Sequence, residues 1–262
     1  MKIQDFATKK TNGVPITMVT CYDAWSATLI ADTDIDCVLV GDSVAMVVYG
    51  HDTTIPADLE MMVAHTAAVR RGAPDAFIIG DMPFLSYRRG LAASVDSAAA
   101  LMRSGANAIK LEGAPGNIEL IRHLVESGVP VMGHLGLTPQ SVHQLGGFRV
   151  QAKNGEAAEK LISQAVELQR AGCFAIVLEA IPATVAERVT ARLTVPTIGI
   201  GAGRHVDGQV LVLQDLLGVS TTFRPKFVRT WMDGSDVIRE ALQSYHLDVT
   251  EGTFPNGGES YE

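Results

Sequence analysis

The stretch AIKLEG at residues 108–113 is a short apolar run that predicts a buried strand, although it carries a lysine and a glutamate. Side chains two positions apart on a strand share a face, so Lys110 and Glu112 project together while Ile109 and Leu111 project oppositely. Buried charges are tolerated when they are paired or coordinate a metal. The stretch therefore predicts either the wall of a functional site or a structural ion pair.

Apolar strand-like runs alternate with helical patterns through most of the 262 residues. This alternation is typical of a parallel sheet with crossover helices, and seven or eight such units predict a single-domain (β/α)8 TIM barrel of the α/β class. The predicted strands are Ile16–Cys21, Cys37–Val40, Ala76–Gly80, Ala108–Glu112, Val129–Gly133, Phe174–Glu179, Thr197–Ile200 and, weakly marked, Leu217–Thr221. The predicted helices are Ser26–Ala31, Ala57–Arg71, Val95–Ser104, Asn117–Ser127, Glu156–Ala171, Ala183–Leu193, Gly208–Leu216 and Asp236–Ser244.

No polar or Pro/Gly-rich linker interrupts this alternation before the last dozen residues. We therefore expect one barrel domain over residues 1–250. The remaining residues, 251–262, are rich in Gly, Pro, Asn, Ser and acidic residues and have too little apolar surface to pack, so a loosely ordered tail is expected.

The composition, 47% apolar residues with a net charge of -8, is that of a soluble globular protein. The first ten residues lack the apolar core of a signal peptide, and no uncharged apolar run reaches the roughly 20 residues that span a bilayer. We expect a cytoplasmic protein that contacts no membrane. Its acidic balance and scattered basic residues argue against nucleic-acid binding. Cys21, Cys37 and Cys173 lack zinc or redox spacing and are predicted to be reduced core residues.

Acidic residues follow three consecutive predicted strands. Asp42, Asp81 and Glu112 should meet at one rim, because parallel barrel strands present their carboxyl ends on the same face. All three are oxygen donors with no Cys or His between them, which favours a hard ion such as Mg²⁺ over zinc. Each aspartate alone could equally be a turn or helix-cap residue, so the prediction depends on their combination.

A short internal repeat brings a fourth acid to the same rim. The pattern Gly-x-x-Ala-Ile-x-Leu-Glu occurs at residues 105–112 and again at residues 172–179. Both copies run from the end of a helix to the end of a strand, so Glu179 is expected to match Glu112 in position. Glu179 is therefore a candidate for a fourth metal ligand or for a base.

Three other features leave alternatives open. Lys110 could form a Schiff base with a carbonyl substrate or remain charged and hold a carboxylate or enolate oxygen; the second role is more economical beside a metal. His134, at a strand end, could belong to the site or simply bond to the backbone. The glycine run at 199–203 could receive a phosphate or a flat ring, or could form a tight turn.

Several segments, taken together in order, resemble the ketopantoate (3-methyl-2-oxobutanoate) hydroxymethyltransferase family of pantothenate biosynthesis. They are VLVGDSVAMVVYG (38–50), HTAAVRRGAP (65–74), GDMPF (80–84), KLEG (110–113), PVMGHLGLTPQS (130–141), VLEAIP (177–182), TIGIGAG (197–203) and DGQVLVLQDLLG (207–218). The resemblance runs from about Phe6 to Phe254. Departures, such as Ala180 where many members have cysteine, lie at the edge of the expected pocket.

The resemblance implies a (β/α)8 barrel that binds Mg²⁺, is a homo-oligomer (a decamer) and uses small-molecule substrates, a 2-oxoacid and a folate. The activity it implies is transfer of a one-carbon unit from 5,10-methylenetetrahydrofolate, the co-substrate, to 3-methyl-2-oxobutanoate, giving 2-dehydropantoate and tetrahydrofolate. Matched position by position, its metal ligands fall on Asp42, Asp81 and Glu112, and its proton acceptor on Glu179. Its 2-oxoacid contacts fall on Asp42, Ser43, Asp81 and Lys110, and we add His134 to the candidate substrate-binding residues.

Two other functions are compatible with the same residues. One is a metal-dependent aldolase or lyase with the same type of barrel, acting on another 2-oxoacid. The other is a barrel that binds an oxoacid or a metal as a regulatory or assembly module without turnover. Glu179 beside a complete set of metal ligands favours catalysis over simple binding.

Overall fold

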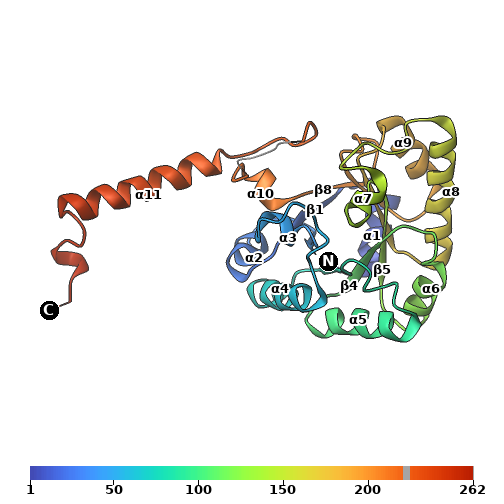
Figure 1. The fold of residues 1–262 in the computed structure, drawn as a ribbon, viewed down its shortest axis with the longest axis horizontal. Coiled ribbons are helices and arrows are strands. Elements are labelled where there is room, and N and C mark those ends of the chain that lie inside the picture. The colour runs from blue at the N-terminus through green and yellow to red at the C-terminus, as the bar shows by residue number, and fades with distance from the viewer. Residues whose placement is uncertain (221–224, 262) are drawn as a thin grey trace. The chain divides into compact units, whose positions relative to one another are not determined.

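The computed structural model describes residues 1–220 and 225–261, and eight parallel strands in these residues close into a barrel (Figure 1). Each strand pairs with the next in sequence, and β8 pairs with β1, with Ile16 opposite Gly208. The predicted (β/α)8 barrel is confirmed. The strands are β1 Ile16–Thr20, β2 Cys37–Val40, β3 Ile78–Asp81, β4 Ala108–Glu112, β5 Val131–Gly136, β6 Ala175–Glu179, β7 Thr197–Ile200 and β8 Gly208–Leu211.

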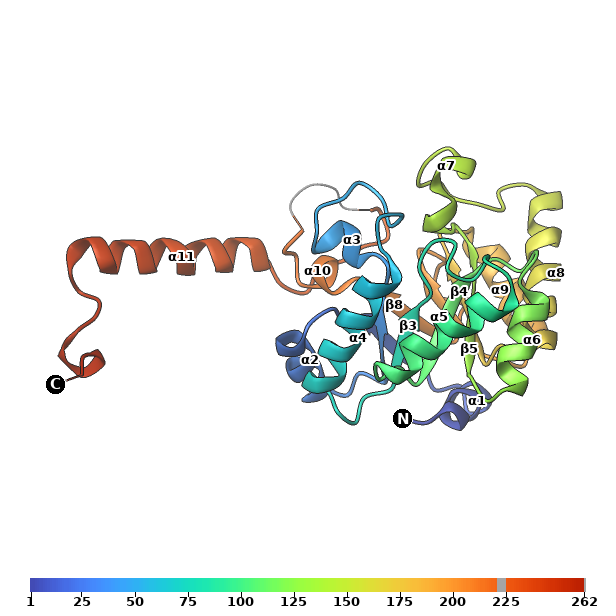
Figure 2. The same ribbon diagram turned by 60° about the horizontal axis from the view of Figure 1, so that its bottom comes forward.

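The helices between the strands cover the outside of the barrel (Figures 1 and 2). Those of the barrel unit are α1 Ile3–Thr11, α2 Ala24–Ala31, α3 Val44–Val47, α4 Leu59–Gly72, α5 Leu91–Arg103, α6 Ile118–Glu126, η1 Pro139–Ser141, α7 Val142–Leu145, α8 Gly155–Ala171 and α9 Ala183–Arg192. Several begin at a capping side chain: Asp23, Asp58 and Asn154 each accept a hydrogen bond from the backbone N–H three residues on. In the described part of the chain, no helix is long and apolar enough to cross a membrane.

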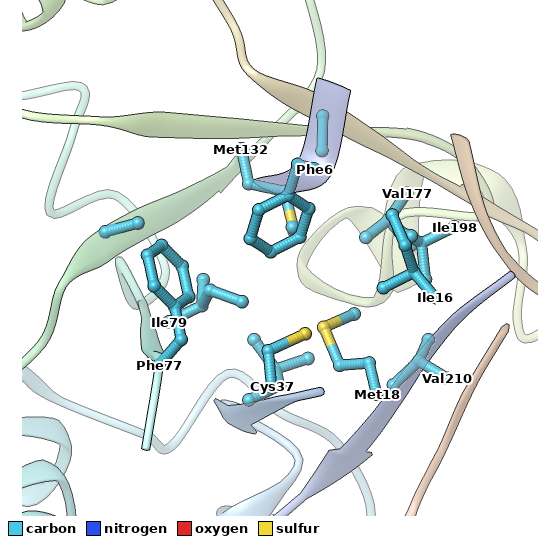
Figure 3. Packing of buried hydrophobic residues seen from close by; sticks show 13 residues of the cluster. Phe6, Ile16, Met18, Cys37, Phe77, Ile79, Met132, Val177, Ile198 and Val210 are labelled. Carbon is cyan, nitrogen blue, oxygen red and sulfur yellow. The ribbon is translucent and has the colours of Figure 1, made fainter. Parts of the chain in front are cut away.

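Alternate residues of the strands point into the barrel and form its apolar core (Figure 3). Because the side-chain period of a strand is two, one residue in two from every strand enters this core. The three cysteines are buried and free, as predicted. The core residues are Phe6, Ile16, Met18, Cys37, Leu39, Phe77, Ile79, Ala108, Met132, Ala175, Val177, Ile198 and Val210.

Helix α1, which the sequence analysis did not predict, closes the N-terminal end of the barrel. Its Phe6 is fully buried and packs against Phe77 and Phe174, with ring centroids 5.2 and 4.9 Å away. Phe77 and Phe174 each come directly before a strand, so these rings fill the end where the strands begin. The opposite end, where the strands finish, carries the polar residues.

We expect Phe6→Ala to destabilise the protein by about 3–5 kcal/mol, because it removes a buried ring and leaves a cavity among two others. Chemical unfolding followed by circular dichroism measures this change. Leu29→Ala on α2 is the control, since Leu29 is 59% exposed and a surface truncation should cost less than about 0.5 kcal/mol. Equal losses in the two variants would show that Phe6 does not anchor α1.

The eighth strand lies earlier in the sequence than predicted. Residues 208–216 were expected to be helical and Leu217–Thr221 to be the strand, but β8 is Gly208–Leu211 and only Leu213–Leu216 is helical (α10). Residues 217–220 form no strand, and Thr221 lies outside the described residues. Pairing with β1 and burial of Val210 in the core override the local helical pattern.

The chain divides into two compact units, Met1–Val212 with the barrel and Leu213–Glu262. The second unit contains α10, α11 Gly234–Glu251 and the short turn η2 Gly257–Glu259. Exposed apolar side chains of α11 include Val237, Ile238, Leu242 and Tyr245. The predicted boundaries, 1–250 for the barrel and 251–262 for a loose tail, stay predictions.

Candidate functional site

The predicted site residues continue the inward-facing positions of the core to the C-terminal ends of the strands. A step of two residues along a strand keeps the same face, so a core residue is followed by a site residue. Four strands show this relation. The pairs are Ile79 and Asp81, Ala108 and Lys110, Met132 and His134, and Val177 and Glu179.

Six of these side chains, from five strands or strand ends, lie together and are called the rim cluster. Five of the six residues are at least 96% buried in the barrel unit, and Glu179 is the sixth. Its side chain is 17% exposed, against 3% for Glu112, so Glu179 is the more accessible acid. The cluster consists of Asp42, Asp81, Lys110, Glu112, His134 and Glu179.

Lys110 forms its ion pair with Asp81 and not with its neighbour on the strand. Lys110 Nζ lies 2.9 Å from Asp81 Oδ1, and β3 and β4 place the two residues opposite each other. Burial works to lower the pKa of Lys110, but the charges of Asp81, Glu112 and Asp42 outweigh it and raise that pKa. Lys110 is therefore a charged ammonium whose ion-pair partner is Asp81, which argues against the simple alternative of a Lys110–Glu112 structural pair.

Asp42 lies in the loop after β2 and is hydrogen-bonded to two other parts of the site. Its backbone N–H donates to Asp81 Oδ2 over 3.1 Å, and its carboxylate accepts from Gln140 Nε2 at 2.8 Å. Burial, and then the charges of Asp81 and Glu112, raise the pKa of Asp42 to about 8. Without a further cation, the site therefore disfavours full ionisation of its acids.

Ser43, the next residue, is half-buried beside the rim cluster. Its hydroxyl lies 2.8 Å from the hydroxyl of Tyr22, which follows β1. Burial raises the pKa of Tyr22, so this phenol stays neutral. The contact brings the loops after β1 and β2 together, and the role of Ser43 as a substrate contact stays a prediction.

His134 lies between two glutamates. His134 Nδ1 is 3.4 Å from Glu112 Oε1 and 3.3 Å from Lys110 Nζ, and His134 Nε2 is 3.2 Å from Glu179 Oε2. Burial and the Lys110 charge lower the pKa of His134, but its contacts with Glu112 and Glu179 prevail and raise it to about 9. His134 therefore belongs to the cluster and does not serve only to bond the backbone.

The chain turns sharply after Glu179. Ala180 has a φ of 46°, a left-handed conformation that is uncommon for a residue other than glycine. The Ala180 N–H donates to the carbonyl of Ile200, and the Ala180 carbonyl accepts from the N–H of Gln151. Such strained positions are held by their surroundings and occur at functional sites.

Gln140 is a site residue that the sequence analysis missed. It lies in η1, is 4% exposed, and contacts both Asp42 and Glu112. Its segment was recognised only as part of a family motif, and a glutamine after a strand carries no chemical signature of its own. Only the fold shows that the loop after β5 reaches across to β2 and β4.

The glycine run 199–203 forms a close-packed turn after β7. Gly201 and Gly203 have φ of 64° and 81°, and a Cβ on Gly203 would lie 2.4 Å from the Cβ of Ala183. Glycine is therefore required here by the backbone and by packing against α9. The backbone conformation and the packing against α9 therefore explain the glycines at 201 and 203, and no bound ligand is needed to explain them.

The residues fit a hard divalent cation in charge and in chemistry. Four carboxyl groups of the rim cluster face one lysine and one histidine, and Asp81 Oδ1 and Glu112 Oε1 are buried without a hydrogen-bond donor of good geometry. Within residues 1–220 and 225–261, no three His, Cys, Asp or Glu side chains form a ready-made ligand set. Mg²⁺ commonly takes one or two protein carboxylates and completes its shell with substrate and water, so the donors remain suitable.

Comparison with known sequences identifies close relatives over the full length. The sequence profile described as ketopantoate hydroxymethyltransferase matches residues 1–257. The 3-methyl-2-oxobutanoate hydroxymethyltransferase of Bdellovibrio bacteriovorus is 56% identical over 259 residues, which cover 99% of this chain and 98% of the relative. The protein of the same name from Legionella pneumophila is 52% identical over 262 residues and covers 100% of both chains.

Solved structures share the barrel at low sequence identity. A 2,3-dimethylmalate lyase, a member of the PEP mutase/isocitrate lyase superfamily, has a TM-score of 0.63 at 16% identity and covers 94% of this chain and 88% of its own. Phosphonopyruvate hydrolase in complex with oxalate and Mg²⁺ has a TM-score of 0.63 at 11% identity, covering 99% of this chain and 93% of its own. At such identities the likeness shows the fold alone.

Proposed function

The chain belongs to the ketopantoate hydroxymethyltransferase family, and on that premise we propose that it transfers a hydroxymethyl group from 5,10-methylenetetrahydrofolate to 3-methyl-2-oxobutanoate. Water is the third reactant and supplies the hydroxyl of the new group. The products are 2-dehydropantoate and tetrahydrofolate, and the reaction is a step of pantothenate biosynthesis. The observation that carries the proposal is the rim cluster, in which a partly accessible glutamate faces three buried acids and a charged lysine.

Glu179 is the base in this proposal. It removes the proton from C3 of the 2-oxoacid, which gives an enolate whose carbon forms a bond to the one-carbon unit carried by folate. Both bonds from that unit to the folate nitrogens break, water supplies the hydroxyl oxygen, and the C3 proton and one proton of the water end on the two nitrogens. His134, whose Nε2 lies 3.2 Å from Glu179 Oε2, orients this carboxylate toward the cluster. Glu179 is preferred as the base because it is the more exposed acid and can reach a substrate from the mouth of the barrel.

The other residues of the cluster bind and orient the 2-oxoacid. Asp42, Asp81 and Glu112 would hold Mg²⁺, which when bound acts as a Lewis acid toward the substrate oxygens. Phosphonopyruvate hydrolase, with the same fold, was solved with Mg²⁺ and oxalate. The Lys110 ammonium offsets the negative charge that develops on the substrate, and the Ser43 hydroxyl contacts its carboxylate.

Lys110 should form no covalent adduct with the substrate. Because the acids around it raise its pKa, it lacks the neutral amine that attack on a carbonyl requires. Treatment with borohydride in the presence of 3-methyl-2-oxobutanoate should leave the intact mass unchanged. Exposed Lys160 serves as the internal control for nonspecific labelling. A substrate-sized increase mapped to Lys110 would replace the electrostatic role with an imine mechanism.

One assay tests the proposed function. Purified protein with Mg²⁺, 3-methyl-2-oxobutanoate and 5,10-methylenetetrahydrofolate should form 2-dehydropantoate, detected by mass spectrometry, and omission of the folate should abolish product. Cleavage of another 2-oxoacid without folate would favour the alternative function, a metal-dependent aldolase or lyase. No turnover under any of these conditions would favour a binding module.

Two further expectations stay predictions. The family resemblance implies a homo-oligomer, a decamer, and sedimentation analysis would measure the mass of the assembly. The sequence composition implies a cytoplasmic protein without nucleic-acid or membrane partners. Both are properties of the protein in solution or in the cell, and the catalytic proposal does not depend on them.

A further inference from the structure

One buried amide connects two acids of the rim cluster that come from different strands. The side chain of Gln140 donates from Nε2 to Asp42 Oδ2 over 2.8 Å and to the carbonyl of Met82 over 3.0 Å. Its backbone N–H donates to Glu112 Oε2 over 3.1 Å. Its side-chain carbonyl, Oε1, accepts from the hydroxyl of Tyr87 at 2.7 Å. Four loops or strand ends, those after β2, β3, β4 and β5, therefore meet at one glutamine.

We propose that Gln140, held by Tyr87, is a positioning residue that fixes the carboxylates of Asp42 and Glu112 for binding of a divalent cation. The inference rests on the metal site of the proposed function and adds two residues to it. Neither residue is a candidate ligand or base. Partners of this kind orient metal-binding side chains and commonly alter metal affinity when they are removed.

The acceptors Asp42 Oδ2 and the Met82 carbonyl determine which way the amide of Gln140 points, and Tyr87 holds the other end of the amide. The Tyr87 hydroxyl donates to Oε1, which leaves the amide NH₂ directed at the two acceptors, Asp42 Oδ2 and the Met82 carbonyl. The reversed amide would place a carbonyl oxygen against both of those oxygens. Tyr87 is 7% exposed, so water cannot readily replace its hydroxyl.

The backbone contact of Gln140 with Glu112 adds a second restraint, so that one residue holds both Asp42 and Glu112. Gln140 holds Asp42 through its side chain and Glu112 through its backbone, so rotation of either carboxylate breaks a hydrogen bond to the same residue. Pro139 precedes it at the start of η1, and the proline ring restricts the backbone there. The two carboxylates would otherwise repel each other and rotate apart in the absence of a cation.

Isothermal titration of the full-length protein with Mg²⁺ alone tests the proposal. Gln140→Met keeps the length of the side chain but removes the amide, and we expect Mg²⁺ affinity to fall by roughly 10–100-fold. Tyr87→Phe removes only the hydroxyl that donates to Oε1 of the amide, and a fall of about 5-fold is expected. Tyr87→Phe also keeps the test valid if Gln140→Met folds poorly.

Gln169→Met is the matched control. Gln169 Oε1 accepts from the backbone of Thr194 and Val195 outside the rim cluster, so the same substitution should lower stability and leave Mg²⁺ affinity within about twofold of the wild type. A Gln140→Met protein that is less stable but binds Mg²⁺ like the wild type would overturn the proposal. So would a Tyr87→Phe protein of unchanged affinity, or a wild type that binds no Mg²⁺.

The same titration separates this inference from the proposed function. Suppose that the wild type binds Mg²⁺ and the two variants bind it more weakly, but none of them forms 2-dehydropantoate. The positioning role of Gln140 and Tyr87 is then supported, and the assigned reaction is wrong. If product forms in the wild type while Mg²⁺ affinity is equal in all variants, the assigned reaction is supported and the positioning role of Gln140 and Tyr87 is wrong.

Discussion

Glu179→Gln is expected to lower kcat/KM by about 10²–10⁴-fold, the usual contribution of a general base. The amide keeps the shape of the side chain and removes its basicity. Asp42, Asp81 and Lys110 keep their contacts with one another and with Gln140, none of which involves Glu179. The Gln variant should therefore bind Mg²⁺ and 3-methyl-2-oxobutanoate like the wild type. Steady-state kinetics and titration calorimetry measure the two effects separately.

Glu159→Gln is the control for this variant. Glu159 is an exposed residue of α8 whose ion pair with Arg188 lies on the surface. Surface pairs contribute little to stability, so activity should not change. If Glu179→Gln instead loses Mg²⁺ binding, Glu179 is a metal ligand, and the proton acceptor must be sought among the other residues of the barrel mouth.

Removal of divalent metal should abolish activity, and Mg²⁺ should restore it. The acids of the rim cluster carry more negative charge than Lys110 and His134 offset, and this excess contributes to the pKa of about 8 for Asp42. Asp81→Asn should weaken Mg²⁺-dependent substrate binding by at least about 10-fold, since it removes one anionic group and the partner of Lys110. Activity after dialysis against EDTA, and titration of the variant, measure these effects.

Asp96→Asn provides a matched substitution on the exposed surface of α5 and should leave metal dependence unchanged. Full turnover by exhaustively demetallated protein would show that the acids are structural. Retention of wild-type Mg²⁺ affinity in Asp81→Asn would remove Asp81 from the metal site while leaving Glu179 as the base.

Much of this site could be predicted from sequence because a strand has a period of two. Once residues 108–112 are taken as a strand, Lys110 and Glu112 must share a face, and the barrel brings the ends of neighbouring strands to one rim. The register of β3 and β4 adds that Asp81 lies beside Lys110, a pairing that the sequence analysis did not predict. The positions of charged residues in apolar runs were therefore informative.

Other features depend on contacts between distant residues and have no local signal. The sequence of β8 favours a helix by its apolar spacing, and only closure of the ring against β1 makes it a strand. Phe6 of α1 is one aromatic residue in a polar segment until Phe77 and Phe174 surround it. Gln140 likewise becomes part of the site only through its contacts with Asp42 and Glu112, which are 98 and 28 residues away in sequence.

Exchange of the C3 proton of 3-methyl-2-oxobutanoate in deuterated water, followed by ¹H NMR without folate, tests the central claim most directly. The account requires that Glu179 removes this proton at a site that needs a divalent cation. The wild type with Mg²⁺ should exchange the proton, whereas demetallated wild type and Glu179→Gln with Mg²⁺ should not. Exchange at the wild-type rate in the Gln variant, or in the metal-free protein, would contradict the account.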